Sequence, residues 1–183
     1  MKCMKNGLIC VALLLCIGAG LTAQFIYNPA NTPAVGNGNS WPFNLYTGWR
    51  FQFIIDKKVL GGGPLLISDI AFSGYYSPAK TFSVPDFQMR MGHTTYSNFG
   101  SSSANPLFDN VLGPTPTEVY TRGAIKWVCN YQAWSDIGLT NSFAYNGNDN
   151  ICVEIRYNTT TSGGVTIITD PGISRAYTHT IFE

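Results

Sequence analysis

Alternation between apolar and polar side chains is the feature that most restricts the fold of this 183-residue chain. The alternation is sharpest from Ile151 to Tyr157, where Cys152, Glu154 and Arg156 separate the apolar residues. A period of two puts successive side chains on opposite faces of a strand, so one face can pack on a core while the other faces water. The pattern therefore predicts a protein built from β-sheets.

The stretch from Gly63 to Thr95 holds two more alternating segments, joined by a turn-rich link. The faces expected to pack on the core are Leu66, Ser68, Ile70 and Phe72 in the first segment and Phe87, Met89 and Met91 in the second. Pro64, Pro78 and Pro85 are expected to lie outside these strands, because proline cannot donate a ladder hydrogen bond.

The same pattern, with turn-forming residues between the segments, predicts about nine short strands and no long helix after residue 24. The other expected strands are 49–55, 118–121, 126–129, 134–139, 151–157, 165–169 and 176–182. Such spacing is typical of an all-β fold, and we expect an antiparallel β-sandwich. Residues 96–117 are expected to form a long loop held down by its apolar residues, Phe99, Leu107, Phe108 and Val111.

Residues 1–23 have the pattern of a secretory signal peptide. Lys2 and Lys5 precede an apolar run from Leu8 to Leu21, and Ala23 offers a small residue at the expected cleavage point. We predict an exported protein with a signal peptide at 1–23, an N-terminal arm at 24–48 and one β-sandwich domain at 49–183.

Two alternatives to cleavage remain open at the sequence level. The first is an uncleaved anchor, although the apolar run is short for a span of about 20 residues. The second is a lipoprotein with Cys16 lipidated, although bulky Leu15 stands where a small residue is preferred. With the signal peptide removed, we expect no transmembrane segment.

Few charges remain after export. Charged residues make up 11% of the chain, against about 25% in an ordinary soluble domain. Loss of Lys2 and Lys5 leaves nine basic and ten acidic residues, so no basic stripe for nucleic acid is expected. An uncharged, amide- and hydroxyl-rich composition favours an extracellular or cell-surface sandwich and argues against a cytosolic α/β enzyme.

Only two of the five cysteines, Cys129 and Cys152, follow the predicted signal peptide. In an oxidising compartment such a pair is most simply a disulfide. The alternative is two unpaired thiols. No metal site is expected from these residues, since neither belongs to a Cys-x-x-Cys motif and the two histidines lie far away in sequence.

Three segments resemble an uncharacterised module found in secreted bacterial surface proteins. They are GPLLISDIAF at 63–72, FQMRMGHTT at 87–95 and FAYNGNDNICVEIRYN at 143–158. They fit the pattern GPxxIxxIxF…RMGHTT…FxYxGxxN, and the resemblance covers residues 45–158. It implies a jelly-roll-like β-sandwich that is exported, and it implies no reaction.

Candidate catalytic and metal-binding residues are few. His93 is the strongest candidate for a reactive group, but the chain has no Gly-x-Ser-x-Gly motif that would supply a nucleophilic serine. His179 has the same parity as Tyr177 and Ile181, so it is expected to lie on one face of a strand. A structural role is expected for both histidines. The run from Asn146 to Asn150 could bind calcium, but it has one carboxylate and its Asn-Gly pair favours a turn. We predict no catalytic residues, no metal and no cofactor.

Four aromatic residues in predicted loops are candidates for contact with a ligand: Trp41, Tyr75, Tyr76 and Tyr96. Exposed aromatic rings can stack on sugars, whereas the alternative is that they cap the core. The leading hypothesis is a secreted, non-enzymatic surface, matrix or adhesion module that binds a carbohydrate or a protein at the cell surface. The alternative is a structural subunit that assembles with its own copies through edge strands or a donated N-terminal strand, and a secreted hydrolase ranks last.

Overall fold

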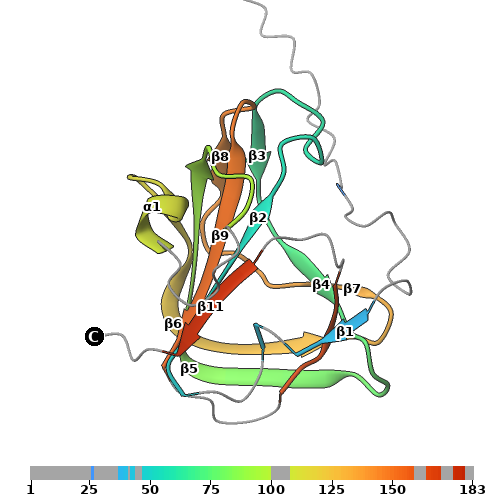
Figure 1. The fold of residues 1–183 in the computed structure, drawn as a ribbon. Coiled ribbons are helices and arrows are strands. Elements are labelled where there is room, and N and C mark those ends of the chain that lie inside the picture. The colour runs from blue at the N-terminus through green and yellow to red at the C-terminus, as the bar shows by residue number, and fades with distance from the viewer. Residues whose placement is uncertain are drawn as a thin grey trace, which may run out of the picture.

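The computed structural model describes residues 26, 37–40, 42–43, 47–99, 108–158, 164–169 and 175–179. The predicted signal peptide and most of the 24–48 arm lie outside this part. Within it the regular structure is antiparallel β-sheet, as predicted, apart from one short helix (Figure 1). The elements are β1 (Asn37–Asn39), β2 (Trp49–Ile55), β3 (Leu65–Ile67), β4 (Ala71–Ser73), β5 (Lys80–Thr94), α1 (Phe108–Leu112), β6 (Thr117–Cys129), β7 (Trp134–Asp136), β8 (Phe143–Tyr145), β9 (Asn150–Tyr157), β10 (Ile167–Thr169) and β11 (Arg175–His179).

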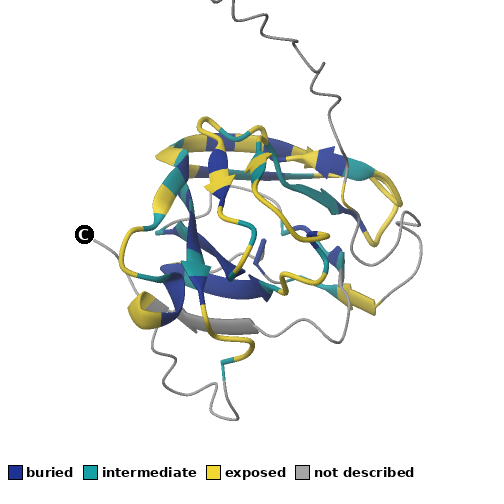
Figure 2. Cartoon of the chain, turned by 90° about the horizontal axis from the view of Figure 1, so that it is seen from above, coloured by how far each residue is buried: buried dark blue, intermediate teal, exposed yellow. Residues whose placement is uncertain are grey.

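The largest sheet has five strands in the order β11-β2-β9-β5-β6, and every neighbouring pair is antiparallel. β9 lies between β2 and β5, and its inner side chains Val153 and Ile155 are fully buried. The predicted strands 49–55 and 151–157 are confirmed by β2 and β9. Figure 2 shows the buried residues gathered along the central strands and the exposed ones in the connecting loops.

Three two-stranded sheets complete the described fold: β1–β10, β3–β8 and β4–β7. Apolar side chains of these small sheets join those of the five-stranded sheet in one core. The largest fully buried members include Trp49, Phe82, Phe87, Met89, Met91, Phe143, Tyr145, Ile155 and Tyr157. The predicted core face Phe87, Met89 and Met91 is therefore confirmed.

β5 and β6 are longer than expected, and they bend together below the core (Figure 1). Their pairing shifts register at three places between Val84 and Arg90, and bulges of this kind bend strands. Pro85 lies inside β5 rather than outside a strand, which corrects the prediction. It falls at the first register shift, where its missing N–H leaves no gap in the ladder.

The single strand predicted through Leu66 and Phe72 is divided between β3 and β4, which belong to different sheets. Asp69 lies between β3 and β4, and its carboxylate accepts hydrogen bonds from the backbone N–H groups of Ile70, Gly138 and Leu139. The predicted inner face is also wrong for this half, since Leu66 is 71% exposed.

The segment that was expected to be a long loop includes a five-residue helix, α1. Val111 and Leu112 of α1 are buried with Ile54 and Cys152 in a second apolar cluster, with Phe99 packed against it. Phe99 and Val111 therefore hold the segment down as predicted. Leu107 lies outside the described residues. The described helix is too short to cross a membrane.

The predicted Cys129–Cys152 disulfide is not formed, and both thiols are free and buried. Cys129 belongs to the main core, whereas Cys152 belongs to the second cluster on the other face of the sheet. Their partners on β5 are Lys80 and Gly92, which are separated by about 40 Å of strand length at 3.3 Å per residue. A disulfide requires Cα atoms within about 7 Å.

Burial also makes these thiols unreactive. It raises the pKa of Cys129 to about 12 and raises the pKa of Cys152 further, so both stay protonated at neutral pH, and the thiolate is the reactive form. We expect the protein without residues 1–23 to titrate no thiol with Ellman's reagent when native and two when denatured without reductant. Two thiols missing after denaturation would show that the disulfide exists.

Candidate functional site

The outer face of the five-stranded sheet carries two rows of polar side chains across β2, β9 and β5. Strand register puts Gln52, Glu154 and Arg90 in one row and Arg50, Arg156 and Gln88 in the next. We call these six residues the arginine–glutamate network. Sequence analysis expected this face to lie in water, but Gln52 and Glu154 have no exposed surface.

Glu154 is the centre of the network. Its Oε2 accepts hydrogen bonds from Arg50 Nε at 2.6 Å and Gln52 Nε2 at 2.7 Å. Its Oε1 accepts from Arg90 Nε at 2.9 Å, and Arg156 Nε lies 3.5 Å from the same oxygen. A buried carboxylate needs partners of this kind because it has lost its water shell. The network therefore ties three strands together through one charge.

Two acidic residues lie at the rim of the network. Arg50 Nη2 donates to Asp109 of α1 at 2.6 Å, and this bond lowers the pKa of Asp109. A hydrogen bond from Gln88 does most to lower the pKa of Glu118 on β6. Both carboxylates stabilise the fold above the pKa that they have in the unfolded chain. Their contribution is lost as the pH falls through the lower pKa of the folded state.

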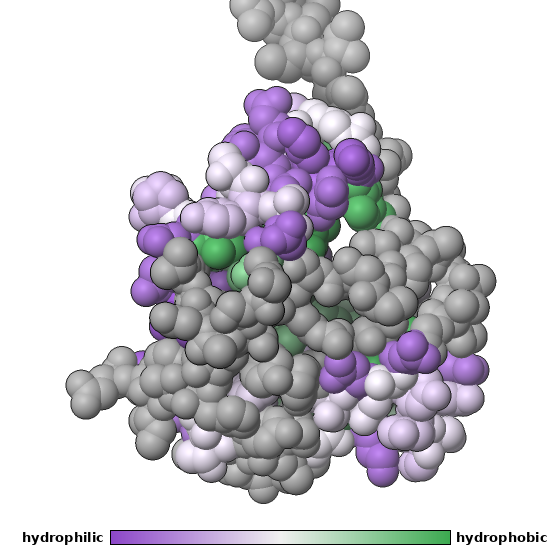
Figure 3. All heavy atoms as spheres, in the orientation of Figure 1, coloured by the Kyte–Doolittle hydropathy of each residue, from purple (hydrophilic) through white to green (hydrophobic). Residues whose placement is uncertain are grey.

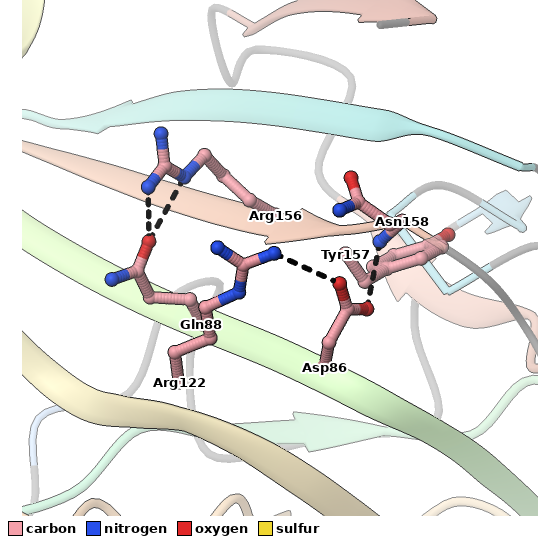
Figure 4. A pocket seen from close by; sticks show the side chains of 6 residues that line it. All are labelled: Asp86, Gln88, Arg122, Arg156, Tyr157 and Asn158. Carbon is pink, nitrogen blue, oxygen red and sulfur yellow. Dashed lines mark hydrogen bonds and ion pairs between the residues drawn. The ribbon is translucent and has the colours of Figure 1, made fainter. Parts of the chain in front are cut away.

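Beside the network, where β9 ends, lies a small hollow (Figure 4). Its lining residues are Asp86, Gln88, Arg122, Arg156, Tyr157 and Asn158. Arg156 donates to Gln88 Oε1 through both Nε and Nη2. Asp86 accepts from the backbone N–H of Asn158 at 2.8 Å and from Arg122 Nη2 at 3.3 Å. The hollow is thus lined by two guanidinium groups and one carboxylate.

Two of the four predicted contact aromatics lie together at one end of the molecule. Tyr75 and Tyr76 are 37% and 57% exposed, and their rings meet edge to face with centroids 4.8 Å apart. Tyr131, which is 43% exposed, belongs to the adjacent loop, and its backbone bridges to Gly74, which precedes Tyr75. We call Tyr75, Tyr76 and Tyr131 the tyrosine surface. Tyr131 was not among the predicted contact residues, because the sequence does not reveal that the residues after the 126–129 strand pair with Gly74.

The loops that carry the tyrosine surface are held by backbone hydrogen bonds. Gly74 N–H donates to Asn130 O, Gln132 N–H to Gly74 O, and Tyr75 N–H to Thr166 O, each at 2.9 Å. The ring of Tyr75 lies so close to Gly38 that a Cβ there would be 2.6 Å from it. These hydrogen bonds and this contact fix the backbone of the loops that carry the tyrosines.

The other two predicted contact aromatics do not join this surface. Tyr96 is 41% exposed, but it follows the end of β5 at Thr94, at the other end of the strand from Tyr75 and Tyr76. Its carbonyl accepts a hydrogen bond from Asn150. Trp41 lies outside the described residues.

His93 has the structural role that was expected. Its ring packs on Phe143 and Tyr145, with centroids 4.9 and 6.0 Å away. Its Nε2 accepts a hydrogen bond from the backbone N–H of Asn146 at 3.0 Å. These contacts fix the loop after β8. The side chain of His179 lies outside the described part.

The run from Asn146 to Asn150 forms a turn between β8 and β9, as favoured, but not a hairpin, because these strands pair with different neighbours. Asn146 Oδ1 accepts from the backbone N–H groups of Asn148 and Asp149. Figure 3 shows hydrophilic residues gathered at the upper end of the molecule. Among the described residues, no three acidic, histidine or cysteine side chains are placed to hold a metal ion.

Sequence reasoning missed the network because alternation assigns a face without revealing which strands become neighbours. A signal was present: β2, β5 and β9 each carry two long polar side chains of the same parity, which is unusual where charges are scarce. The resemblance to a secreted surface module stays a prediction. No family model, curated protein or solved structure matches the chain.

Proposed function

We propose that this chain is a secreted, non-enzymatic binding module of the cell surface or extracellular matrix, which contacts a carbohydrate through its tyrosine surface. In this proposal the sheets form a jelly-roll-like β-sandwich, and the loops at one end present the ligand site. The signal-peptide pattern of residues 1–23 supports export.

The tyrosine surface is the observation that carries the proposal. Three tyrosines from two loops are exposed, the rings of Tyr75 and Tyr76 touch, and hydrogen bonds hold the two loop backbones together. Tyrosine supplies a large contact area with few rotatable bonds, so a fixed loop loses little entropy on binding. The neighbouring Asn130 and Gln132 are exposed and uncharged. Amide groups beside aromatic rings suit a polyhydroxylated ligand.

The test is binding of the exported protein to a glycan array, followed by titration of the best glycan. We expect Tyr76→Ala and Tyr131→Ala each to weaken binding by about tenfold or more, which corresponds to about 1.4 kcal/mol. The matched control is Tyr96→Ala, because Tyr96 is 41% exposed, close to Tyr131 at 43%, but lies at the other end of β5. No binder on the array, or equal losses in all three variants, would contradict the proposal.

Self-assembly remains the alternative. Among the described strands β6 pairs only with β5, so it forms an edge of the five-stranded sheet. Its exposed side chains include Lys126, and a lysine on an edge strand opposes pairing with another copy. Size-exclusion chromatography and electron microscopy of the exported protein should therefore show discrete monomers, whereas ordered polymers would favour assembly.

A further inference from the structure

Gln132, in the loop between β6 and β7, has a backbone conformation that its residue type disfavours. Its φ is +50°, and among the described residues it is the only one other than glycine with a positive φ. In the left-handed region the Cβ crowds the following carbonyl oxygen, so glycine enters this region freely and most other residues do so at a cost. Glycine at position 132 would allow the same turn without this strain.

Hydrogen bonds around Gln132 hold this conformation. The backbone N–H of Gln132 donates to Gly74 O, and the backbone N–H of Gly74 donates to Asn130 O, each at 2.9 Å. Asn130 is held in turn by Ser135, whose Oγ accepts from the backbone N–H of Asn130 at 2.9 Å and from its Nδ2 at 3.2 Å. A Cβ on Gly74 would be 2.7 Å from Asn130 O, so the close approach of the two loops requires glycine there. A strained residue persists only where its surroundings fix it in this way.

The side chain of Gln132 gives the fold nothing in return for this strain. It is exposed, and its amide has no hydrogen-bond partner among the described residues. Strained residues that the fold itself does not need are typical of functional sites. The amide has two N–H donors and an acceptor oxygen, which are open to a ligand.

We propose that Gln132 is the specificity-determining residue of the tyrosine surface, and that its amide forms hydrogen bonds with two neighbouring hydroxyl groups of a neutral sugar. This inference rests on the proposed function. Gln132 directly follows Tyr131, and its N–H is bonded to Gly74, which precedes Tyr75. An amide can donate to one hydroxyl group and accept from the next one. The tyrosines would then supply contact area, while Gln132 fixes the orientation of the sugar.

The composition of the two loops favours a neutral sugar over an acidic one. Residues 75–79 and 130–133 include no charged side chain, and their polar side chains are amides, phenols and one hydroxyl group. An anionic sugar loses part of its water shell on binding, and a positively charged partner is needed to offset that loss. We therefore expect neutral glycans to bind more tightly than acidic or sulfated ones.

The experiment uses the exported protein on an array of neutral, acidic and sulfated glycans, followed by titration of the best glycan. Gln132→Ala removes the amide but keeps the strain, so it should weaken binding roughly tenfold without changing the midpoint of thermal unfolding. Gln132→Gly removes both, so it should weaken binding equally and raise the midpoint by about 2–4 °C. The matched control is Asn98→Ala, which removes an exposed amide near Tyr96 and should leave binding unchanged.

Single-deoxy analogues of the best glycan locate the contact. Two analogues that lack adjacent hydroxyl groups should bind the unmodified protein less tightly than the parent glycan does. Gln132→Ala should bind these analogues and the parent glycan about equally, because the partner of the missing hydroxyl is already gone. Equal sensitivity of Gln132→Ala and the unmodified protein to every deoxy position would contradict the assigned contact.

The remaining outcomes separate this inference from the proposed function. Full binding by Gln132→Ala beside weak binding by Tyr76→Ala would overturn the role of Gln132 and leave the carbohydrate site standing. An acidic or sulfated best glycan would also overturn the inference alone. A midpoint that does not rise in Gln132→Gly would count against it too, because Gln132 would then be unstrained or needed by the fold. An array without any binder would remove both proposals.

Discussion

Replacing Glu154 by glutamine is expected to lower the free energy of unfolding by about 3–5 kcal/mol, the range for breaking a buried ion pair by removing one partner. The carboxylate is fully buried and accepts short hydrogen bonds from Arg50, Gln52 and Arg90. Glutamine keeps the shape but leaves the surrounding guanidinium groups without their central negative charge. Urea unfolding at pH 7, followed by tryptophan fluorescence, measures the loss.

The matched control is Asp109→Asn, which removes the other carboxylate bonded to Arg50. The Asp109 side chain is 85% exposed, and exposed ion pairs contribute about 0–1 kcal/mol. A small loss for Asp109→Asn beside a large loss for Glu154→Gln would show that burial decides the effect. A loss below about 1 kcal/mol for Glu154→Gln would mean that the network does not hold the sheet together.

The sequence predicted the inner faces of the long strands correctly. Phe87, Met89 and Met91 on β5 and the apolar side chains of β9 are buried as their alternation indicated. Alternation succeeds there because a strand of this length cannot slip by one residue without turning its apolar side chains outward. It fails for short segments such as β3, which has only three residues and whose Leu66 faces outward.

The arginine–glutamate network could not be predicted, because it depends on strand order. Arg50 and Glu154 are separated by 104 positions in the chain, and they meet only since β9 lies between β2 and β5. Neither the sequence around Arg50 nor the sequence around Glu154 specifies which strand will be its neighbour. The predicted disulfide failed for the same reason, since Cys129 and Cys152 lie on opposite faces of the sheet.

The covering helix was also missed, although the fold depends on how closely it approaches the sheet. Gly92 of β5 lies directly beneath the end of α1, and a Cβ built on it would be 1.8 Å from the carbonyl oxygen of Leu112. Leu112 is buried against Ile54 and Cys152. A residue with any side chain at position 92 would therefore force α1 away from the cluster that it covers.

Gly92→Ala is accordingly expected to lower the free energy of unfolding by about 3 kcal/mol, at the upper end of the range for overpacking. The obstructing atom belongs to the backbone, so no side-chain rotation relieves the clash. Local opening should accompany the loss, and hydrogen exchange of residues 108–113 should become faster than in the unmodified protein. Thermal unfolding and hydrogen-exchange mass spectrometry measure the two effects.

Gly123→Ala on β6 is the matched control, because the only contact of a Cβ there is Thr121 O at 3.6 Å, an ordinary packing distance. That variant should stay within about 0.5 kcal/mol of the unmodified protein, as surface substitutions usually do. If Gly92→Ala left the free energy of unfolding unchanged, α1 would have to move away from the sheet without any loss of stability. The second apolar cluster would then contribute nothing to the stability of the sheet.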